Sequence, residues 1–193
     1  MDNVEPIEMG YEAMTEESPF SPEEEEMVRQ IALKRAPDAL VKIEGHLSDS
    51  EAFVHLPGAA AAAFHLERFT EAKVLAEKVL FLAPSFRENW NYGNAIHLGH
   101  TVLGLLAIEQ CDIKLAIEEL EKSGNTPGSP QLNSFGPTMQ LAKELLKKGQ
   151  TEAALAYLKQ CRKFWEMGTT WLDLWEQRIH AGHVPNFFQH CYA

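Results

Sequence analysis

His97 and His100 are the side chains of this sequence best suited to chemistry, because imidazoles bind metals and transfer protons near neutral pH. If the stretch is helical, residues three apart lie about 60° apart around the axis, so both rings could reach one ligand. Asn94 and Thr101 flank the pair on the same stretch. The four side chains together form a candidate site for a metal, a small molecule or a substrate.

A metal site is the interpretation that the surrounding sequence supports least. Catalytic metals usually have about three protein ligands and one open position. Neither an HExxH pattern nor a third local carboxylate follows His100, so His65, Glu67 or a loop residue would have to complete the set. We therefore expect no metal and no cofactor. The ordinary alternative is that His100 packs between helices while His97 hydrogen-bonds across a groove.

A second polar region is the stretch NTPGSPQLNSFGP at 125–137, the longest run of turn-forming residues in the chain. Loops of this length inside a compact helical domain are uncommon and often functional. The stretch contains neither GxxxxGK[ST] nor GxSxG, which argues against a phosphate-binding loop or a nucleophile elbow. Two interpretations stay open: a connector made of local turns, or a lid or lip on a groove, to which Asn133 and Ser134 contribute.

Two further groups of reactive side chains have structural explanations. His180, His183 and the pair His190-Cys191 are metal-ligand types, but their spacing matches no zinc module, so we expect surface histidines. Arg162 lies beside Cys161, and a cationic neighbour can lower the pKa of a thiol. Because Cys161 also lies on an apolar helical face, we expect it to be an inert core residue.

The net charge of −11 belongs to one end of the chain. Residues 1–26 hold ten acidic side chains and no Lys or Arg, which leaves 18 acids against 17 bases over residues 27–193. A nearly neutral body without a basic stripe argues against nucleic-acid binding, because that affinity depends on Lys and Arg meeting phosphates. We therefore expect no nucleic-acid partner, and we expect residues 1–20 to form an acidic, mobile tail.

The remaining composition predicts a cytoplasmic protein of one domain. The chain has 193 residues, 45% of them hydrophobic, which is enough for a sizeable core. Its three cysteines lie far apart, as is typical of reduced thiols. The N-terminus MDNVEPIEMG is acidic, the wrong sign for a signal or transit peptide. No apolar run approaches the roughly 20 residues that a bilayer crossing needs, so we expect no membrane partner.

Helical periodicity runs through the chain and no useful alternation indicates a strand, so the sequence predicts an all-α fold. The organising stretch is Trp90–Leu120, two amphipathic helices joined by a tight turn at residues 110–112. Pro37 is expected to end the first helix, with a short helix at 38–47 after it, and Pro57-Gly58 is expected to kink or restart the next helix. The predicted domain spans 21–193, with hairpins at 53–86, 88–124 and 137–166 and a capping helix at 169–182.

The three hairpins share a spacing that resembles the tetratricopeptide (TPR) repeat. Small residues such as Gly104, Ala116 and Ala154 would lie where two helices cross, and larger residues would fill the gaps between hairpins. The resemblance covers about residues 53–165 and implies TPR-like antiparallel hairpins stacked into a compact curved bundle. The residues that carry it are Phe69, Ala72, Ala76, Leu80, Leu82, Pro84, Leu103, Gly104, Asp112, Ala116, Leu120, Leu141, Ala142, Gly149, Ala154 and Leu158.

Similarity to TPR proteins implies a concave groove, lined by the first helix of each hairpin, that binds a peptide or another protein. The Lys/Asn set with which some TPR modules clamp a C-terminal carboxylate is missing, since the matching positions are Val54, Pro57 and Ala61. Docking of chaperone tails is therefore disfavoured. Transferred to this chain, the groove residues are Trp90, Asn94, Leu98, Thr101, Leu105, Ile108, Glu109, Met139, Lys143 and Leu146. His97 and His100 lie on the same helix and are counted with the candidate binding residues.

Two functions of different classes follow. The first is a non-enzymatic TPR-like interaction module that binds a protein or peptide in the groove, with the acidic tail tuning association. The alternative is a small helical enzyme or ligand-binding protein, whose pocket would lie between Asn94, His97, His100 and Thr101 and the 125–137 loop. Because no complete catalytic motif is present, the sequence favours the first. Apolar residues near the C-terminus leave the oligomeric state open.

Overall fold

The computed structural model describes residues 22–187, 190 and 192, and the regular secondary structure of this part of the chain is helical, without a strand. The all-α prediction is confirmed. The expected tail at 1–20 lies outside the described residues. The α-helices are α2 (Pro22–Val41), α3 (Asp49–His65), α4 (Phe69–Leu82), α5 (Tyr92–Glu109), α6 (Ile113–Gly124), α7 (Pro130–Phe135), α8 (Gln140–Lys147), α9 (Thr151–Cys161) and α10 (Thr169–His180).

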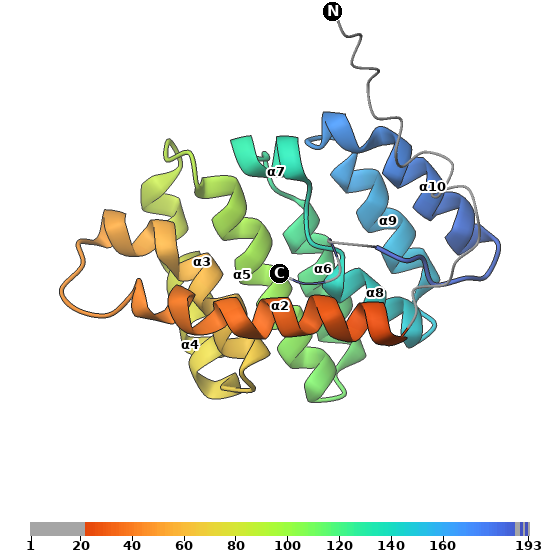
Figure 1. Ribbon diagram of the computed structural model, residues 1–193. Coiled ribbons are helices and arrows are strands. Elements are labelled where there is room, and N and C mark those ends of the chain that lie inside the picture. Colours follow the sequence, from red (N-terminus) through yellow and green to blue (C-terminus); the bar gives the residue numbers. More distant parts are fainter. Residues whose placement is uncertain (1–21, 188–189, 191, 193) are drawn as a thin grey trace, which may run out of the picture.

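Three helical hairpins, α3/α4, α5/α6 and α8/α9, stand side by side and form the body of the bundle (Figure 1). Their first helices are neighbours in order, since α3 contacts α5 and α5 contacts α8. The prediction of packed antiparallel hairpins is therefore confirmed. Two short 3-10 turns, at Ala83–Phe86 and Glu166–Gly168, lead into the second hairpin and into α10.

The turns of the three hairpins have one geometry. Each contains a residue with left-handed backbone, Glu67 and Cys111 with φ 59° and Gly149 with φ 77°. In each, the next N–H donates 2.9 Å to the carbonyl oxygen five residues earlier, as in Arg68 to Ala63. The same bonds join Asp112 to Ala107 and Gln150 to Leu145. A repeated backbone motif of this kind satisfies carbonyls at the end of each first helix and reverses the chain.

Small residues lie at the helix crossings, as predicted. Ala116 and Ala154 are buried, and Gly104 packs so tightly that an added Cβ would lie 2.2 Å from Leu141 Cδ2. Gly104 belongs to α5 and Leu141 to α8, so the absent side chain lets two successive hairpins approach each other. Interior packing of this density tolerates no extra methyl group without movement.

Pro57 does not interrupt α3, which runs unbroken from Asp49 to His65, so a restart of the helix at Pro57-Gly58 is wrong. A proline removes the N–H that would bond to the carbonyl four residues earlier, here that of Phe53. The buried Asn91 replaces it, because its side-chain Nδ2 donates to the carbonyl oxygens of Phe53 and Val54, both at 3.2 Å. A residue far along the chain, just before α5, thus supplies the donor that the proline lacks.

Pro37 likewise lies within a continuous helix, because α2 runs from Pro22 to Val41. The predicted break at Pro37 and the separate helix at 38–47 are therefore wrong. Pro37 is exposed, where water can solvate the carbonyl that the missing N–H leaves free. Ala36 and Leu40, on the buried side of α2, pack in the core of the first hairpin.

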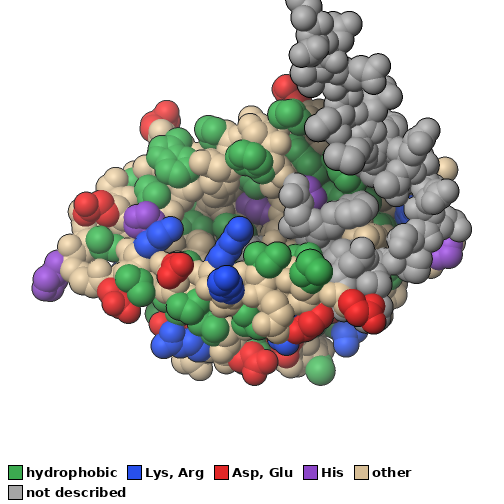
Figure 2. All heavy atoms as spheres, viewed as in Figure 1, with side chains coloured by type: hydrophobic (Ala, Val, Ile, Leu, Met, Phe, Trp, Pro, Cys, Tyr) green, Lys and Arg blue, Asp and Glu red, His purple; other side chains and the backbone are tan. Residues whose placement is uncertain are grey.

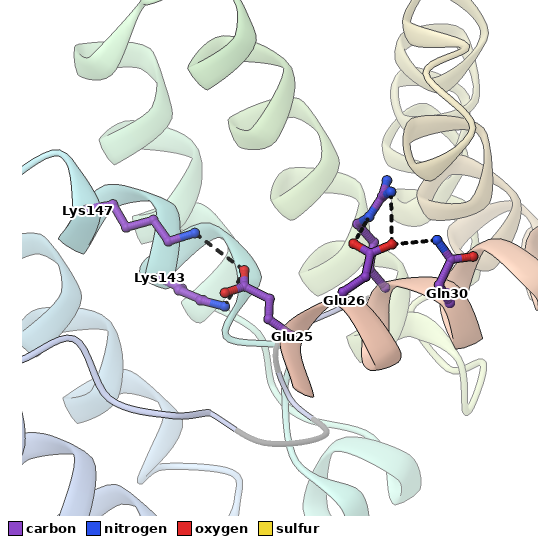
Figure 3. A network of polar contacts seen from close by, with 6 residues as sticks. Glu25, Glu26, Gln30, Lys143 and Lys147 are labelled. Carbon is purple, nitrogen blue, oxygen red and sulfur yellow. Dashed lines mark hydrogen bonds and ion pairs between the residues drawn. The ribbon is translucent and has the colours of Figure 1, made fainter. Parts of the chain in front are cut away.

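Helix α2 lies across the first helices of the three hairpins (Figure 1). Its last half contacts α3, while its first half reaches α8 through ion pairs. Glu25 Oε1 lies 2.7 Å from Nζ of the buried Lys143 and 3.5 Å from Nζ of Lys147 (Figure 3). Glu26 turns instead to Arg29 and Gln30 of its own helix. Hydrogen bonds from Lys143 and Lys147 overcome the effect of burial and lower the pKa of Glu25.

The stretch 125–137 is shorter as a loop than expected, because α7 occupies residues 130–135. Ser129 caps α7, its Oγ accepting from the Leu132 N–H at 3.0 Å, and Pro130 stands in the first turn, where no backbone donor is needed.

Near the C-terminus of the chain, α10 packs through Trp175, which contacts Trp165 and Phe187 with ring centroids 5.8 and 5.0 Å apart. The sequence predicts a helix here at 169–182, and α10 occupies Thr169–His180.

None of the described helices combines the length and the apolar character that a membrane span requires.

Candidate functional site

A cleft of about 450 Å³ opens on the face of the bundle that α2 crosses. Figure 2 shows a hollow there, with histidine side chains inside it and basic side chains at the edge that α2 forms. Helices α2, α5 and α7, the segment 136–138 and the C-terminal residues 190 and 192 enclose it. The lining residues are Arg35, Asn94, His97, Leu98, Gln131, Leu132, Phe135, Gly136, Pro137, Thr138, His190 and Tyr192.

The approach of the 125–137 stretch to α5 forms one wall of the cleft. Gly93 makes this approach possible, because a Cβ there would lie 1.8 Å from the carbonyl oxygen of Gly128. Thr126 Oγ1 donates to the carbonyl oxygen of Gly93 at 3.0 Å and fixes the contact. Gly128 itself has φ 85°, a conformation that favours glycine, so two glycines allow the two segments to touch.

Asn94 joins this wall to α5 through a saturated set of hydrogen bonds. Its Oδ1 accepts from Ser129 Oγ at 2.7 Å. Its Nδ2 donates to Asn91 Oδ1 at 2.8 Å and to Gln131 Oε1 at 3.2 Å. Asn94 therefore orders the floor of the cleft and positions Gln131, whose Nε2 has no partner among the described residues.

His97 lies at the bottom of the cleft with both ring nitrogens bonded to backbone. Nε2 accepts from the Thr138 N–H at 3.1 Å, so Nδ1 carries the proton and donates to the Ser123 carbonyl oxygen at 3.3 Å. Tyr157 stacks on the ring and donates its hydroxyl to the Thr138 carbonyl oxygen at 2.9 Å. Burial lowers the pKa of His97 to about 4, so the neutral form is held. An imidazole in this state joins α5, α6 and the start of the third hairpin, with no nitrogen left to act as a base.

His190 fastens the C-terminal segment to the same wall. Its Nδ1 donates to the Pro137 carbonyl oxygen at 3.0 Å, and its own carbonyl oxygen accepts from the Met139 N–H at 2.7 Å. Burial lowers its pKa, which favours the neutral ring that these bonds require. The surface histidine expected at 190 is therefore buried, whereas His180 and His183 are exposed as predicted. Cys191 lies outside the described residues.

Among the described residues that line the cleft, Arg35 brings the only formal charge, because none of them is an Asp, Glu or Lys. Among the described residues, its guanidinium has neither a hydrogen-bond acceptor nor an acid within ion-pair distance. Gln131 Nε2 is also without a described acceptor. The cleft thus presents two sets of available N–H donors beside the apolar side chains of Leu98, Leu132 and Phe135. Phe135 is 73% exposed, which is unusual for a phenylalanine and places an aromatic ring at the entrance.

His100 and Thr101 do not line the cleft. His100 Nδ1 lies 2.7 Å from Oε2 of Glu119, which Lys122 also contacts at 2.6 Å. Burial alone would raise the pKa of Glu119, but hydrogen bonds from His100 and Lys122 overcome it and lower the pKa. Thr101 is buried and donates to the His97 carbonyl oxygen at 2.8 Å. The two histidines therefore have separate partners, and the described residues hold no group of three or more potential metal ligands.

The other predicted groove residues are divided between different surroundings. Leu105, Glu109 and Lys143 line a smaller cavity of about 180 Å³, closed on one side by Glu25 of α2. Met139 is buried in the core, and Trp90 is half exposed before α5 begins. Asn133 and Ser134 are exposed on α7 outside both cavities. As predicted, Cys161 is buried, and burial raises the pKa of its thiol.

Several cleft residues are not among those that the sequence points to. Gln131, Phe135 and Thr138 lie in or beside the stretch interpreted as a connector or lip, so the sequence points to their region but not to the individual residues. Nothing in the sequence points to Arg35 or Tyr192, because they reach the cleft only through the path of α2 and of the C-terminal segment. Tyr192 lines both cavities and therefore lies between them.

In comparisons with known proteins, no protein-family model, no curated protein and no solved structure matches the chain.

Proposed function

We propose that the protein is a binding module that holds an extended segment of a partner protein in the cleft between α2, α5 and α7. The observation that carries the proposal is the character of the lining. Apolar side chains stand beside available N–H donors, while the imidazole at the bottom has both nitrogens bonded to backbone. Such a lining can bind and orient a peptide but offers no base from His97.

The repeated hairpin geometry supports a TPR-like scaffold as part of this proposal. Each of the three turns has one residue with left-handed backbone followed by the same N–H to carbonyl hydrogen bond, and such repetition is expected of stacked equivalent units. Residues of α5, the first helix of the second hairpin, line the cleft, and TPR proteins bind peptides along the first helices of their hairpins. Widely separated cysteines, two of them free at Cys111 and Cys161, are the basis for placing the protein in the cytoplasm.

The test is a selection from a random peptide library on the purified full-length protein, followed by titration of the selected peptides. Phe135→Ala removes an exposed ring at the entrance and should weaken binding about tenfold or more. Phe81→Ala is the matched control, because Phe81 is 82% exposed on α4 and does not line the cleft. Selection of no peptide, or an equal effect of both variants, would remove the proposal.

A second candidate is a small-molecule binding protein, favoured by the volume and place of the cleft. About 450 Å³ lies in the range of ligand pockets, and the space adjoins Asn94, His97 and the 125–137 stretch. Native mass spectrometry of the protein purified from cells distinguishes the two. A bound metabolite that Phe135→Ala releases, together with failure of the peptide selection, would support this candidate against the first.

A further inference from the structure

We infer that the cleft binds a carboxylate, held by the guanidinium of Arg35 and the side-chain amide of Gln131. The inference rests on the proposed function and names its partner: an extended segment with an Asp or Glu side chain, or a C-terminal carboxylate, beside an apolar residue. Neither the charge of the chain nor the TPR resemblance suggests it, because the net charge is −11 and the clamp positions of the family are Val54, Pro57 and Ala61.

The first argument is the charge of the lining. The chain carries 28 acidic residues, yet none of the twelve described residues that line the cleft is an acid. Among these residues Arg35 is the single formal charge, because burial lowers the pKa of both histidines, His97 and His190, and favours their neutral form. A cleft whose described lining holds one arginine and no acid has a positive local potential, which favours a negative group.

The second argument is the state of the donors. On α2, Glu25 and Arg29 have ion-pair partners at 2.7 and 2.8 Å. Arg35 has no acceptor within the described part of the chain and, unlike its neighbour Lys34, it lines the cleft. Gln131 Oε1 accepts a hydrogen bond from Asn94 Nδ2 at 3.2 Å, so the Nε2 of Gln131 is the group that remains available to a ligand. Both available groups are donors only, and a carboxylate accepts hydrogen bonds only.

The third argument is the surface beside the donors. Leu98, Leu132 and Phe135 provide an apolar wall in the same cleft. A free inorganic anion would leave this wall uncovered, whereas an acidic residue next to an apolar one in an extended segment would use both. The arrangement therefore favours a peptide over a small inorganic anion.

The experiment compares Arg35→Gln with Lys34→Gln in the full-length protein. Lys34 is an exposed neighbour on α2 that does not line the cleft, so both variants lose one positive charge but only one loses a cleft donor. For the peptides chosen by library selection, Arg35→Gln should weaken binding about five- to tenfold and Lys34→Gln less than twofold. Exchanging the acid of the peptide for its amide should weaken binding to the wild type by a similar factor and weaken binding to Arg35→Gln, which keeps only the Gln131 donor, by a clearly smaller one.

A second measurement does not depend on the selection. N-acetyl-glutamate N-methylamide and N-acetyl-glutamine N-methylamide are titrated at constant ionic strength while the Arg35 Nε–H and Gln131 Nε2–H signals are followed by NMR. N-acetyl-alanine and its amide test a C-terminal carboxylate in the same way. A saturable shift of both signals with either acid, absent with its amide, supports the inference and identifies the source of the carboxylate.

The outcomes separate this inference from the proposed function. If peptides bind and Phe135→Ala weakens them, but Arg35→Gln and Lys34→Gln behave alike and selected peptides show no acid, the binding module stands and the carboxylate site is overturned. If no peptide is selected but the blocked glutamate shifts both signals, the carboxylate site stands and the peptide function fails. If neither acid shifts the signals, the carboxylate site is overturned directly.

Discussion

His97 couples stability to pH although it takes no part in proton transfer. Burial lowers its pKa from the usual 6.5 to about 4, so between these values the unfolded chain binds a proton that the folded chain does not. The stabilising contribution of neutral His97 is complete above pH 6.5 and is lost as the pH falls toward 4. Each pH unit in this window is worth about 1.4 kcal/mol, so the loss amounts to about 3 kcal/mol.

We predict that the stability advantage of the wild type over His97→Gln is greatest at neutral pH and shrinks by about 3 kcal/mol by about pH 4. The physical reason is that glutamine can replace a hydrogen bond but cannot gain a proton. Urea unfolding at several pH values measures the difference. His46→Gln, at an exposed position after α2, should match the wild type at every pH. If the difference in free energy of unfolding between the wild type and His97→Gln stays constant from neutral pH down to about pH 4, this account is contradicted.

Asn91 is the residue on which the continuity of α3 depends. Its buried amide donates to the carbonyl oxygens of Phe53 and Val54 at 3.2 Å, beside Pro57. We predict that Asn91→Ala lowers the free energy of unfolding by about 2 kcal/mol, because buried acceptors lose their donor.

A double-mutant cycle tests this cause. In a Pro57→Ala background, the restored backbone N–H can bond to the Phe53 carbonyl, so Asn91→Ala should cost about 1 kcal/mol less than in the wild type. Thermal or urea unfolding of the four proteins gives the coupling. Equal costs in both backgrounds would show that Asn91 acts through some contact other than the carbonyls at the proline.

Among the helices, two glycines have opposite roles. Gly93 lets the 125–137 stretch approach α5, since a Cβ there would lie 1.8 Å from the Gly128 carbonyl oxygen, whereas a Cβ at Gly58 would have no atom within 4 Å. We predict that Gly93→Ala destabilises the protein by about 2 kcal/mol and weakens peptide binding, because the wall of the cleft must move. Gly58→Ala should stabilise α3 by about 0.5–1 kcal/mol, since alanine loses less backbone entropy.

Urea unfolding of the two variants, with peptide titration, checks the pair. Opposite signs of the stability change are the expected result. If both substitutions stabilise the protein, the close approach at Gly93 does not exist in solution, and the wall of the cleft is not positioned as described.

For the molecule as a whole, α2 is a strap over the first helices of the hairpins. Its last half is buried against α3, while its first half is tied to α8 by the ion pairs of Glu25 with Lys143 and Lys147. Because α2 also carries Arg35, the order of this helix affects the wall of the cleft.

We predict that Glu25→Gln makes the backbone amides of residues 25–33 exchange about fivefold faster with deuterium, while α3 and α5 are unchanged. The ion pairs are partly exposed, so high salt should have a similar effect on the wild type. Glu23→Gln, at an exposed position near the start of the same helix, is the control. Hydrogen exchange read by mass spectrometry distinguishes the variants, and unchanged exchange in Glu25→Gln would mean that the strap is held by other contacts.

The local features of this protein can be predicted from the amino-acid sequence. Apolar periodicity specifies the hairpins, and small side chains at Gly104, Ala116 and Ala154 mark the crossings, because both depend on residues a few positions apart. The region of Asn94, His97 and 125–137 stands out for the same reason: its polar residues and turn formers interrupt a helical background.

The continuity of the helices at the prolines and the formation of the cleft, in contrast, depend on tertiary packing. Pro37 and Pro57 predict breaks when the chain is considered locally, but a freed carbonyl can be solvated by water or bonded by a distant side chain such as Asn91. In the same way, Arg35 and Gln131 line one cleft only because α2 crosses the hairpins. Contacts between residues this far apart in the chain arise from the packing of whole helices, and packing leaves no periodic trace in a single sequence.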